Sequence, residues 1–260
     1  MLNLKNYDSI FFDLDGVIYL GDTLIPGVDK TIAKLRESHR VGFITNNASR
    51  TCAEFADKLS LLNIPTDESE VISTPGVLVS AIKNQLPETK KVLAIASSGV
   101  KDLLLEAGYE IVINHDDNPD LEVNGLCKNL TWEHLAEASY AIQAGTPWWA
   151  TNLDPVVPTD HGLAPGNGSI VALLTMVTGK TPRDFGKPNP EIFEHAFKRF
   201  SAKRPLFVGD TLTTDILGAK NAGVDSVLVL TGNTNDQLWA KERANFHPVA
   251  ILNDVNGLVE

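Results

Sequence analysis

The sequence has little cysteine and no long apolar run. Cys52 and Cys127 are its two cysteines, and their separation matches no metal-binding spacing. We therefore expect both to be thiols in a reducing compartment. No apolar run approaches the roughly 20 residues that a membrane span needs, and no charged and apolar leader opens the chain. These absences favour a cytoplasmic protein with no membrane partner.

Basic residues are also scarce. The chain has 22 Lys and Arg against 33 Asp and Glu, which gives a formal net charge of -11 without a long basic run. This balance disfavours a nucleic acid or an anionic membrane as partner. An acidic surface does not attract anionic ligands either, so any anion site has to be built locally from lysine, backbone N–H groups or metal. The 260 residues, 43% of them hydrophobic, are enough for one large domain or two modest ones.

Strand-like and helix-like segments alternate along the chain, which predicts an α/β fold with a doubly wound, Rossmann-like parallel sheet. In the first and last thirds, the predicted strands cover residues 10–14, 41–45, 71–72, 205–209, 226–230 and 249–252. The predicted helices there cover residues 28–38, 51–62, 75–84, 191–200 and 215–222.

The middle of the chain has a complete alternation of its own. Its predicted strands cover residues 91–96, 111–113, 121–126 and 147–151, its predicted helices cover 100–107, 131–144 and 169–177, and 161–169 is predicted as a loop. We therefore predict a core domain made of residues 1–79 plus 183–260 and an inserted α/β domain made of residues 80–182.

Two carboxylates, Asp13 and Asp15, close the first predicted strand and are followed by Gly16. Residues i and i+2 of a strand lie on the same face, so both acids are expected to meet at the carboxyl end of the sheet. Because close carboxylates repel each other, such a pair needs a cation, a shared proton or a charged ligand group to offset the repulsion. A strand followed by an Asp-Gly turn is the simpler interpretation of this motif alone.

Three further segments carry polar residues at predicted element boundaries. Thr45 ends the second strand, Lys187 precedes a helix, and Asp210 and Asp215 follow another buried strand. Each has an ordinary explanation on its own, such as a helix cap, a solvated lysine or a turn. These polar residues all lie at the carboxyl ends of strands or at the starts of helices. Together they indicate one site at one edge of the sheet.

This set of motifs resembles the haloacid dehalogenase-like superfamily, whose phosphatases carry Asp-x-Asp-Gly, a strand-end Ser or Thr, a Lys and Gly-Asp-x-x-x-x-Asp. The chain is also similar to subfamily IIA, the NagD/p-nitrophenyl-phosphatase-like proteins, in Phe-Ile-Thr-Asn-Asn and Gly-Lys-Pro-Asn-Pro. Only residues 17–26 separate the first motif from the next predicted helix, so the insertion belongs between the second and third motifs (a C2-type cap). The subfamily's Asn-Pro-Asp appears here as Asn152-Leu153-Asp154.

The resemblance implies a Mg²⁺-dependent phosphatase that hydrolyses small phosphate monoesters (sugar, glycerol, glycolate or nucleotide phosphates) through an aspartyl-phosphate intermediate. By this resemblance Asp13 is the nucleophile, and Asp15, with a raised pKa, is the general acid and base. The metal would be bound by the carboxylates of Asp13 and Asp210 and by the backbone carbonyl of Asp15. Asp215 would contact these ligands without binding the metal itself.

The resemblance also assigns phosphate binding to Lys187, to Thr45 and to the backbone N–H of Asn46. Asn152 and Asp154, at a predicted strand end of the cap, are candidates for substrate contacts. No residue discriminates among small phosphorylated metabolites, and the oligomeric state is open, with a homodimer as one option.

Other interpretations of the same motifs remain open. A phosphotransferase or mutase on the same fold would use the same residues. A dehalogenase of this superfamily needs neither Asp15 nor magnesium, so both features argue against it. A non-enzymatic phosphoacceptor signalling module is about half as long, has no inserted domain and lacks an acid two residues after the phosphoacceptor.

Overall fold

The computed structural model describes residues 2–159 and 161–259. They form two compact units. The core unit comprises the chain up to Thr45, Cys52–Ile72 and the chain from Lys187 onward, and the inserted unit comprises Asn46–Thr51 and Ser73–Gly186. The domain boundaries expected from the sequence, 79/80 and 182/183, stay a prediction.

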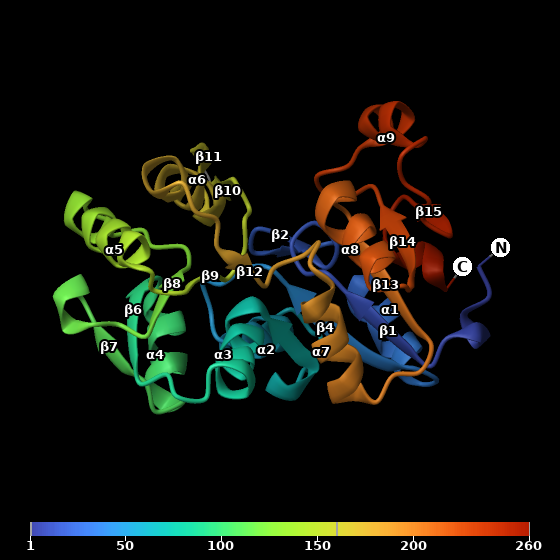
Figure 1. The fold of residues 1–260 in the computed structure, drawn as a ribbon. Coiled ribbons are helices and arrows are strands. Elements are labelled where there is room, and N and C mark those ends of the chain that lie inside the picture. The colour runs from blue at the N-terminus through green and yellow to red at the C-terminus, as the bar shows by residue number, and fades with distance from the viewer. Residues whose placement is uncertain (1, 160, 260) are drawn as a thin grey trace. The chain divides into compact units, whose positions relative to one another are not determined.

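The core unit is built on a six-stranded sheet with β1 (Ser9–Phe12) near its middle (Figure 1). Parallel pairings join β1 to β13 on one side and to β4 on the other. The chain therefore runs outward in both directions from β1, and the carboxyl end of β1 lies at the point where doubly wound sheets form ligand crevices. The other strands of this sheet are β4 (Arg40–Thr45), β5 (Val71–Ser73), β13 (Pro205–Gly209), β14 (Asp225–Val229) and β15 (Ala250–Leu252).

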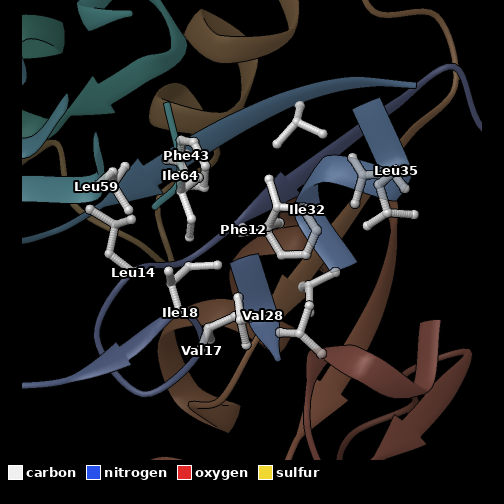
Figure 2. Close-up of a cluster of buried hydrophobic side chains, with 14 of the residues drawn as sticks. Phe12, Leu14, Val17, Ile18, Val28, Ile32, Leu35, Phe43, Leu59 and Ile64 are labelled. Atoms are coloured by element: carbon white, nitrogen blue, oxygen red, sulfur yellow. The ribbon is translucent and has the colours of Figure 1, made fainter. Parts of the chain in front are cut away.

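Both faces of the core sheet are apolar. Ile10 and Phe12 point to the face that packs against α1 (Val28–Arg36) and α2 (Cys52–Leu61), as Figure 2 shows for Phe12 and its neighbours. Phe11 points to the opposite face. Strands buried on both faces are expected in a parallel sheet that is covered by helices on both sides.

The opposite face of the core sheet is lined by aromatic side chains of α7 (Pro190–Phe200). The ring of Phe11 lies 5.2 Å from that of Phe197 and 5.0 Å from that of Phe200. Gly42 of β4 is needed here, because a Cβ at this position would lie 2.8 Å from the rings of Phe11 and Phe200. The helix therefore packs tightly against the strands that lead to the site.

The inserted unit has a parallel sheet of its own, in the order β12-β9-β8-β6-β7. Helices α5 and α6 cover one face, where Leu93, Trp148, Ile142 and Leu174 form a buried cluster. The strands are β6 (Lys91–Ile95), β7 (Glu110–Val112), β8 (Leu121–Asn124), β9 (Trp148–Ala150) and β12 (Arg183–Asp184). The helices are α3 (Thr74–Gln85), α4 (Ser98–Glu106), α5 (Trp132–Ala144) and α6 (Asn167–Thr178).

Most predicted elements are present, with their ends shifted by no more than two residues. The cap predicted for α5 is confirmed, since the side chain of Thr131 accepts the N–H of His134 and Gly145 ends the helix in a left-handed conformation. The fold class, a doubly wound α/β core with an inserted α/β unit, is also confirmed.

Several predictions were wrong. The segment 161–169 is not a loop throughout, because β10 (Val156–Thr159) and β11 (Gly162–Pro165) pair as a hairpin before α6 begins. The helix expected at 215–222 begins as a π-helix, Leu212–Ile216, and continues as α8, Leu217–Asn221. Sequence reasoning also missed short elements whose patterns are weak, namely β2 (Tyr19–Leu20), β3 (Thr23–Leu24), α9 (Asp236–Glu242), β12 and the 3-10 turns at Leu4–Asn6, Glu68–Glu70, His115–Asp117 and Val255–Leu258.

Within the described ranges, none of the helices has both the length and the apolar character that crossing a bilayer requires.

Candidate active site

Asp13 and Asp15 follow β1 at the carboxyl edge of the core sheet. The N–H of Asp13 donates to the carbonyl of Val208 at 2.9 Å, which extends the pairing with β13 by one residue. The chain then turns at Gly16, whose φ of +85° suits glycine and whose N–H bonds the Tyr19 carbonyl at 2.8 Å. β1 ends at Phe12, so strand alternation does not extend to Asp13 and Asp15, and the exposed Asp15 lies beyond the strand, just before the turn.

Lys187 lies between two carboxylates. Its Nζ is 2.8 Å from Oδ1 of Asp13 and 2.6 Å from Oδ1 of Asp215. A third bond runs from Nζ to the carbonyl of Ile44, at 3.4 Å, near the end of β4. The side chain of Lys187 is 2% exposed, so its charge is held in place by these groups rather than by water.

Asp215 is fully buried and uses both of its oxygens. Oδ1 receives Lys187, while Oδ2 accepts the backbone N–H groups of Asp210 at 3.0 Å and Thr211 at 3.1 Å. The π-helical turn Leu212–Ile216 brings Asp215 back under the end of β13. Gly209 makes room for it, because a Cβ there would lie 2.3 Å from the Cβ of Asp215.

Asp210 follows β13 directly and is 1% exposed. Its Oδ2 accepts the Oγ1–H of Thr211 at 3.2 Å and the backbone N–H of Asn233 at 2.5 Å. Its Oδ1 is buried and has no hydrogen-bond partner among the described residues. Gly232 is required beside it, since a Cβ at that position would lie 2.1 Å from Oδ2.

Burial and charge oppose each other at these groups. Burial raises the pKa of Asp13 well above its usual range, Lys187 works against that rise, and the nearby Asp215 and Asp210 add to it. Burial, with the charge of Asp215, raises the pKa of Asp210 to about 7. Burial alone would lower the pKa of Lys187, but the charges of Asp13 and Asp215 outweigh it and raise that pKa. The lysine therefore stays charged, while the pKa values of Asp13 and Asp210 lie above those of free carboxyl groups.

The acids form a cluster that can hold a cation. One carboxylate oxygen each from Asp13, Asp210 and Asp215 lie within 4.8 Å of one another. Asp215 is already engaged by Lys187 and two N–H groups, whereas Oδ1 of Asp210 is a buried carboxyl oxygen without a hydrogen-bond partner among the described residues. Hard, oxygen-preferring cations such as Mg²⁺ suit such donors. The residues present therefore fit a divalent metal.

Thr45 is the last residue of β4 and is buried, and Asn46 follows it as the first residue of the inserted unit. Within that unit, Nδ2 of Asn152 donates to the carbonyl of Asn46 at 2.9 Å, and Nδ2 of Asn46 donates to Oδ1 of Asp154 at 3.3 Å. The two candidate substrate residues of the insertion thus both contact Asn46. The roles predicted for Thr45, Asn46, Asn152 and Asp154 stay predictions.

Sequence reasoning missed the segment after β14. Gly232 and Asn233 pack around Asp210, and the Oγ1–H of Thr231 donates to the carbonyl of Gly16. Asn233 also donates from Nδ2 to Oγ1 of Thr211 at 2.9 Å. A signal was present, because these residues follow a predicted strand of the same parallel sheet and its carboxyl end had to lie at the same edge.

Comparisons with known proteins identify the family of the chain. The family profile described as "Haloacid dehalogenase-like hydrolase" matches residues 10–110, and a related HAD-hydrolase-like profile matches residues 184–258. The chain is 33% identical to an acid sugar phosphatase of Staphylococcus haemolyticus over 97% of this chain and 95% of that protein. It is 38% identical to a D-glycerol 3-phosphate phosphatase of Mycobacterium tuberculosis over 88% of this chain, and it spans 64% of that protein's length.

Solved structures of phosphatases are also similar to this chain. A glycerol phosphate phosphatase from Mycobacterium tuberculosis in complex with magnesium is 35% identical, with a TM-score of 0.90 over 98% of this chain and 77% of that one. A 4-nitrophenylphosphatase from Thermotoga maritima is 30% identical, with a TM-score of 0.90 over 98% and 97%. The fold, the acid and lysine cluster and these similarities lead to one conclusion: the chain belongs to the haloacid dehalogenase-like hydrolase family, in its NagD/p-nitrophenyl-phosphatase-like branch.

Proposed function

We propose that this protein is a magnesium-dependent phosphatase that hydrolyses small phosphate monoesters through a phosphorylated Asp13. The observation that carries the proposal is the placement of Lys187 2.8 Å from Asp13, beside Asp210 with its unsatisfied buried oxygen. This arrangement joins a nucleophile, a fixed positive charge and a metal-binding carboxylate at one strand edge. The similar acid sugar phosphatase, D-glycerol 3-phosphate phosphatase and 5'-nucleotidase support the same class of substrate.

A cation is needed on electrostatic grounds. Two unit charges 4 Å apart interact by about 4 kcal/mol at an effective dielectric of 20, and a phosphate monoester brings about two negative charges to a cluster of acids with one lysine. Carboxylate oxygens of Asp13 and Asp210 and the backbone carbonyl of Asp15 would hold Mg²⁺. When bound, the metal neutralises carboxylate and phosphoryl charge and orients the phosphoryl group.

The hydrolysis takes two displacements at phosphorus. A carboxylate oxygen of Asp13 forms a bond to phosphorus while the bond to the ester oxygen breaks, and that oxygen takes a proton from Asp15. Asp15 then removes a proton from water, whose oxygen displaces the Asp13 carboxylate and gives inorganic phosphate. The exposed position of Asp15, just before the turn after β1, leaves it accessible to a leaving group and to water.

The phosphoryl oxygens need donors as well as metal. Lys187 supplies a charged donor whose position is fixed by Asp215, and Thr45 with the backbone N–H of Asn46 supplies neutral donors. Asp215 contributes by holding Lys187 and the N–H groups of Asp210 and Thr211 in place. Asn152 and Asp154, which both hydrogen-bond to Asn46, complete the set of proposed site residues.

The substrate is a small phosphorylated metabolite, and we expect the protein to act in the cytoplasm without a nucleic acid or membrane partner, with a homodimer still open. The acidic net charge of -11 is the observation that disfavours polyanionic partners.

The test is phosphate release from a panel of sugar, glycerol, glycolate and nucleotide phosphates with and without Mg²⁺. The wild-type protein should release phosphate only with the metal, and Asp13→Asn should release none while its circular dichroism stays unchanged. Wild-type protein that transfers phosphate to an acceptor other than water, or that keeps the phosphate without turnover, would overturn the proposal. Near-normal turnover by Asp13→Asn, with deamidation excluded by mass spectrometry, would reject the nucleophile.

A further inference from the structure

A chain of buried asparagines connects Asn46 with the interior of the inserted unit. Nδ2 of Asn152 donates to the Asn46 carbonyl at 2.9 Å, and Nδ2 of Asn167 donates to the Asn152 carbonyl at 2.7 Å. The same Asn167 amide reaches the carbonyl of Asn124 at 3.4 Å, and Oδ1 of Asn124 accepts the indole N–H of Trp148. Asn152, Asn167 and Asn124 are all buried, so each hydrogen bond is shielded from competition with water.

Asn152 itself is fixed from several sides. Its Oδ1 accepts the N–H of Asp154 at 3.2 Å, and its carbonyl is held by Asn167. Gly186 packs against its backbone so closely that a Cβ on Gly186 would lie 2.8 Å from the Cβ and 2.9 Å from the Cα of Asn152. Because the backbone and both polar atoms of the side chain are held, the amide can present its N–H to Asn46 in only one orientation.

Asn46 accepts hydrogen bonds at its main-chain carbonyl and donates one from its side chain. Its carbonyl accepts Asn152 and, at 3.4 Å, the hydroxyl of Thr74. Its side-chain Nδ2 donates to Oδ1 of Asp154 at 3.3 Å. The carbonyl and the side chain of Asn46 are both restrained, which limits the movement of the residue whose backbone N–H follows Thr45.

We propose that Asn152 and Asp154 are positioning residues, which fix Asn46 so that its backbone N–H can bind the phosphoryl group, and that they do not contact the leaving group. This inference rests on the proposed function, in which Asn46 binds phosphate. Its ligand is the phosphate group common to all substrates of the class. Specificity for the alcohol part of the ester then depends on other residues of the chain.

Binding of inorganic phosphate separates this role from direct contact with substrate, because phosphate has no leaving group. The experiment is calorimetric titration of the Mg²⁺-loaded, full-length protein with inorganic phosphate. Asn152→Asp replaces the donor with a carboxylate oxygen that faces the Asn46 carbonyl, and we expect about tenfold weaker phosphate binding, in keeping with the loss of one hydrogen bond. KM should rise by the same factor for every ester tested.

Two variants of Asp154 test the same role by loss and recovery of phosphate binding. Asp154→Ala removes the acceptor for the Asn46 side chain and should weaken phosphate binding several-fold, whereas Asp154→Asn keeps an acceptor oxygen and should restore it. Because Asp154 is half-buried, this pair remains informative if Asn152→Asp does not fold. Ser139→Ala is the matched control: it removes the hydrogen bond from the buried Ser139 to the Leu135 carbonyl in the same unit and should leave the phosphate affinity unchanged.

Unchanged phosphate binding in Asn152→Asp and Asp154→Ala would overturn the inference, as would KM effects that differ from ester to ester. Wild-type turnover is measured in parallel and tests the proposed function separately. An active wild-type protein with unaffected variants rejects only the positioning role. A wild-type protein that neither binds phosphate nor hydrolyses esters rejects both.

Discussion

Nζ of Lys187 lies 2.6 Å from Oδ1 of Asp215, and both side chains are almost completely buried. Asp215 has no exposed edge, so its role is to hold the ammonium group and the chain after β13 rather than to meet a substrate. Oδ1 of Asp13 lies 2.8 Å from the same Nζ. The lysine therefore links the buried Asp215 to Asp13, the proposed nucleophile, and its position is set by these two carboxylates.

Removing this lysine should destabilise the protein. Lys187→Met leaves the buried Asp215 without its charged partner, and breaking a buried pair in this way costs about 3–5 kcal/mol. Urea unfolding at pH 7 should show this loss, and turnover should be abolished. In a double-mutant cycle, Lys187→Met with Asp215→Asn should cost clearly less than the sum of the two single changes.

The control is the pair Lys241 and Glu242, whose charged atoms are 3.9 Å apart and whose side chains are 78% and 28% exposed. Lys241→Met with Glu242→Gln should show a coupling energy below about 0.5 kcal/mol, as is usual for surface pairs. Strict additivity at Lys187 and Asp215 would mean that the two groups do not support each other.

Strand-end positions predicted much of the site, because a parallel sheet brings carboxyl ends together whatever the intervening sequence. Asp13, Asp210 and Lys187 could thus be grouped by their places at the ends of predicted strands and the start of a predicted helix. The position of Asp15 could not be derived in this way, since strand length decides alternation and β1 ends at Phe12. Likewise, the π-helical turn that carries Asp215 has no hydrophobic period that distinguishes it from the start of an α-helix.

Contacts between distant segments were the hardest to predict. The requirement for glycine at position 232 comes from Asp210, which is 22 residues earlier in the chain, and no local pattern indicates it. The hydrogen bonds of Asn46 to Asn152 and Asp154 span more than 100 residues. Only the three-dimensional packing reveals them.

The unsatisfied oxygen of Asp210 predicts a dependence of stability on magnesium. A ligand that binds only the folded state at 100 times its Kd adds about 2.7 kcal/mol to the free energy of unfolding. Mg²⁺ should therefore raise the melting temperature of the wild-type protein. Asp210→Asn should need at least about tenfold more Mg²⁺ for the same shift, because a neutral amide oxygen attracts the ion less.

Chelation by EDTA should reverse the wild-type shift and have little effect on Asp210→Asn. The control is Asp22→Asn, a change at an almost fully exposed acid, which should respond to Mg²⁺ as the wild type does. Equal responses of Asp210→Asn and wild type would remove Asp210 from the metal site.

Gly232→Ala tests the close packing around Asp210. A methyl group 2.1 Å from Oδ2 has to displace the carboxylate or the backbone, at a cost of about 1–3 kcal/mol. We expect a lower melting temperature together with weaker Mg²⁺ binding. Gly76→Ala is the control, since a Cβ at that position in α3 meets nothing closer than 3.8 Å, and the helix should gain about 0.5–1 kcal/mol. Normal Mg²⁺ affinity in Gly232→Ala would show that Asp210 tolerates displacement.

Glu122 predicts a pH dependence that is independent of catalysis. It is fully buried in β8 of the inserted unit, neither of its carboxylate oxygens has a hydrogen-bond partner among the described residues, and burial raises its pKa well above the usual range. The folded state therefore favours the protonated acid. Its contribution to stability is fully present below the pKa of the unfolded chain and is lost as the pH rises through the higher folded pKa.

Within that window the loss amounts to about 1.4 kcal/mol for each pH unit. Glu122→Gln has no proton to lose, so its free energy of unfolding should exceed that of the wild type by more at pH 8 than at pH 5. The measurement is urea unfolding across this range, with Glu106→Gln, a change at an exposed acid of α4, as the control. If Glu122→Gln and wild type follow parallel curves, the Glu122 carboxyl group does not stay protonated in the folded state, and a nearby positive charge or water must satisfy it instead.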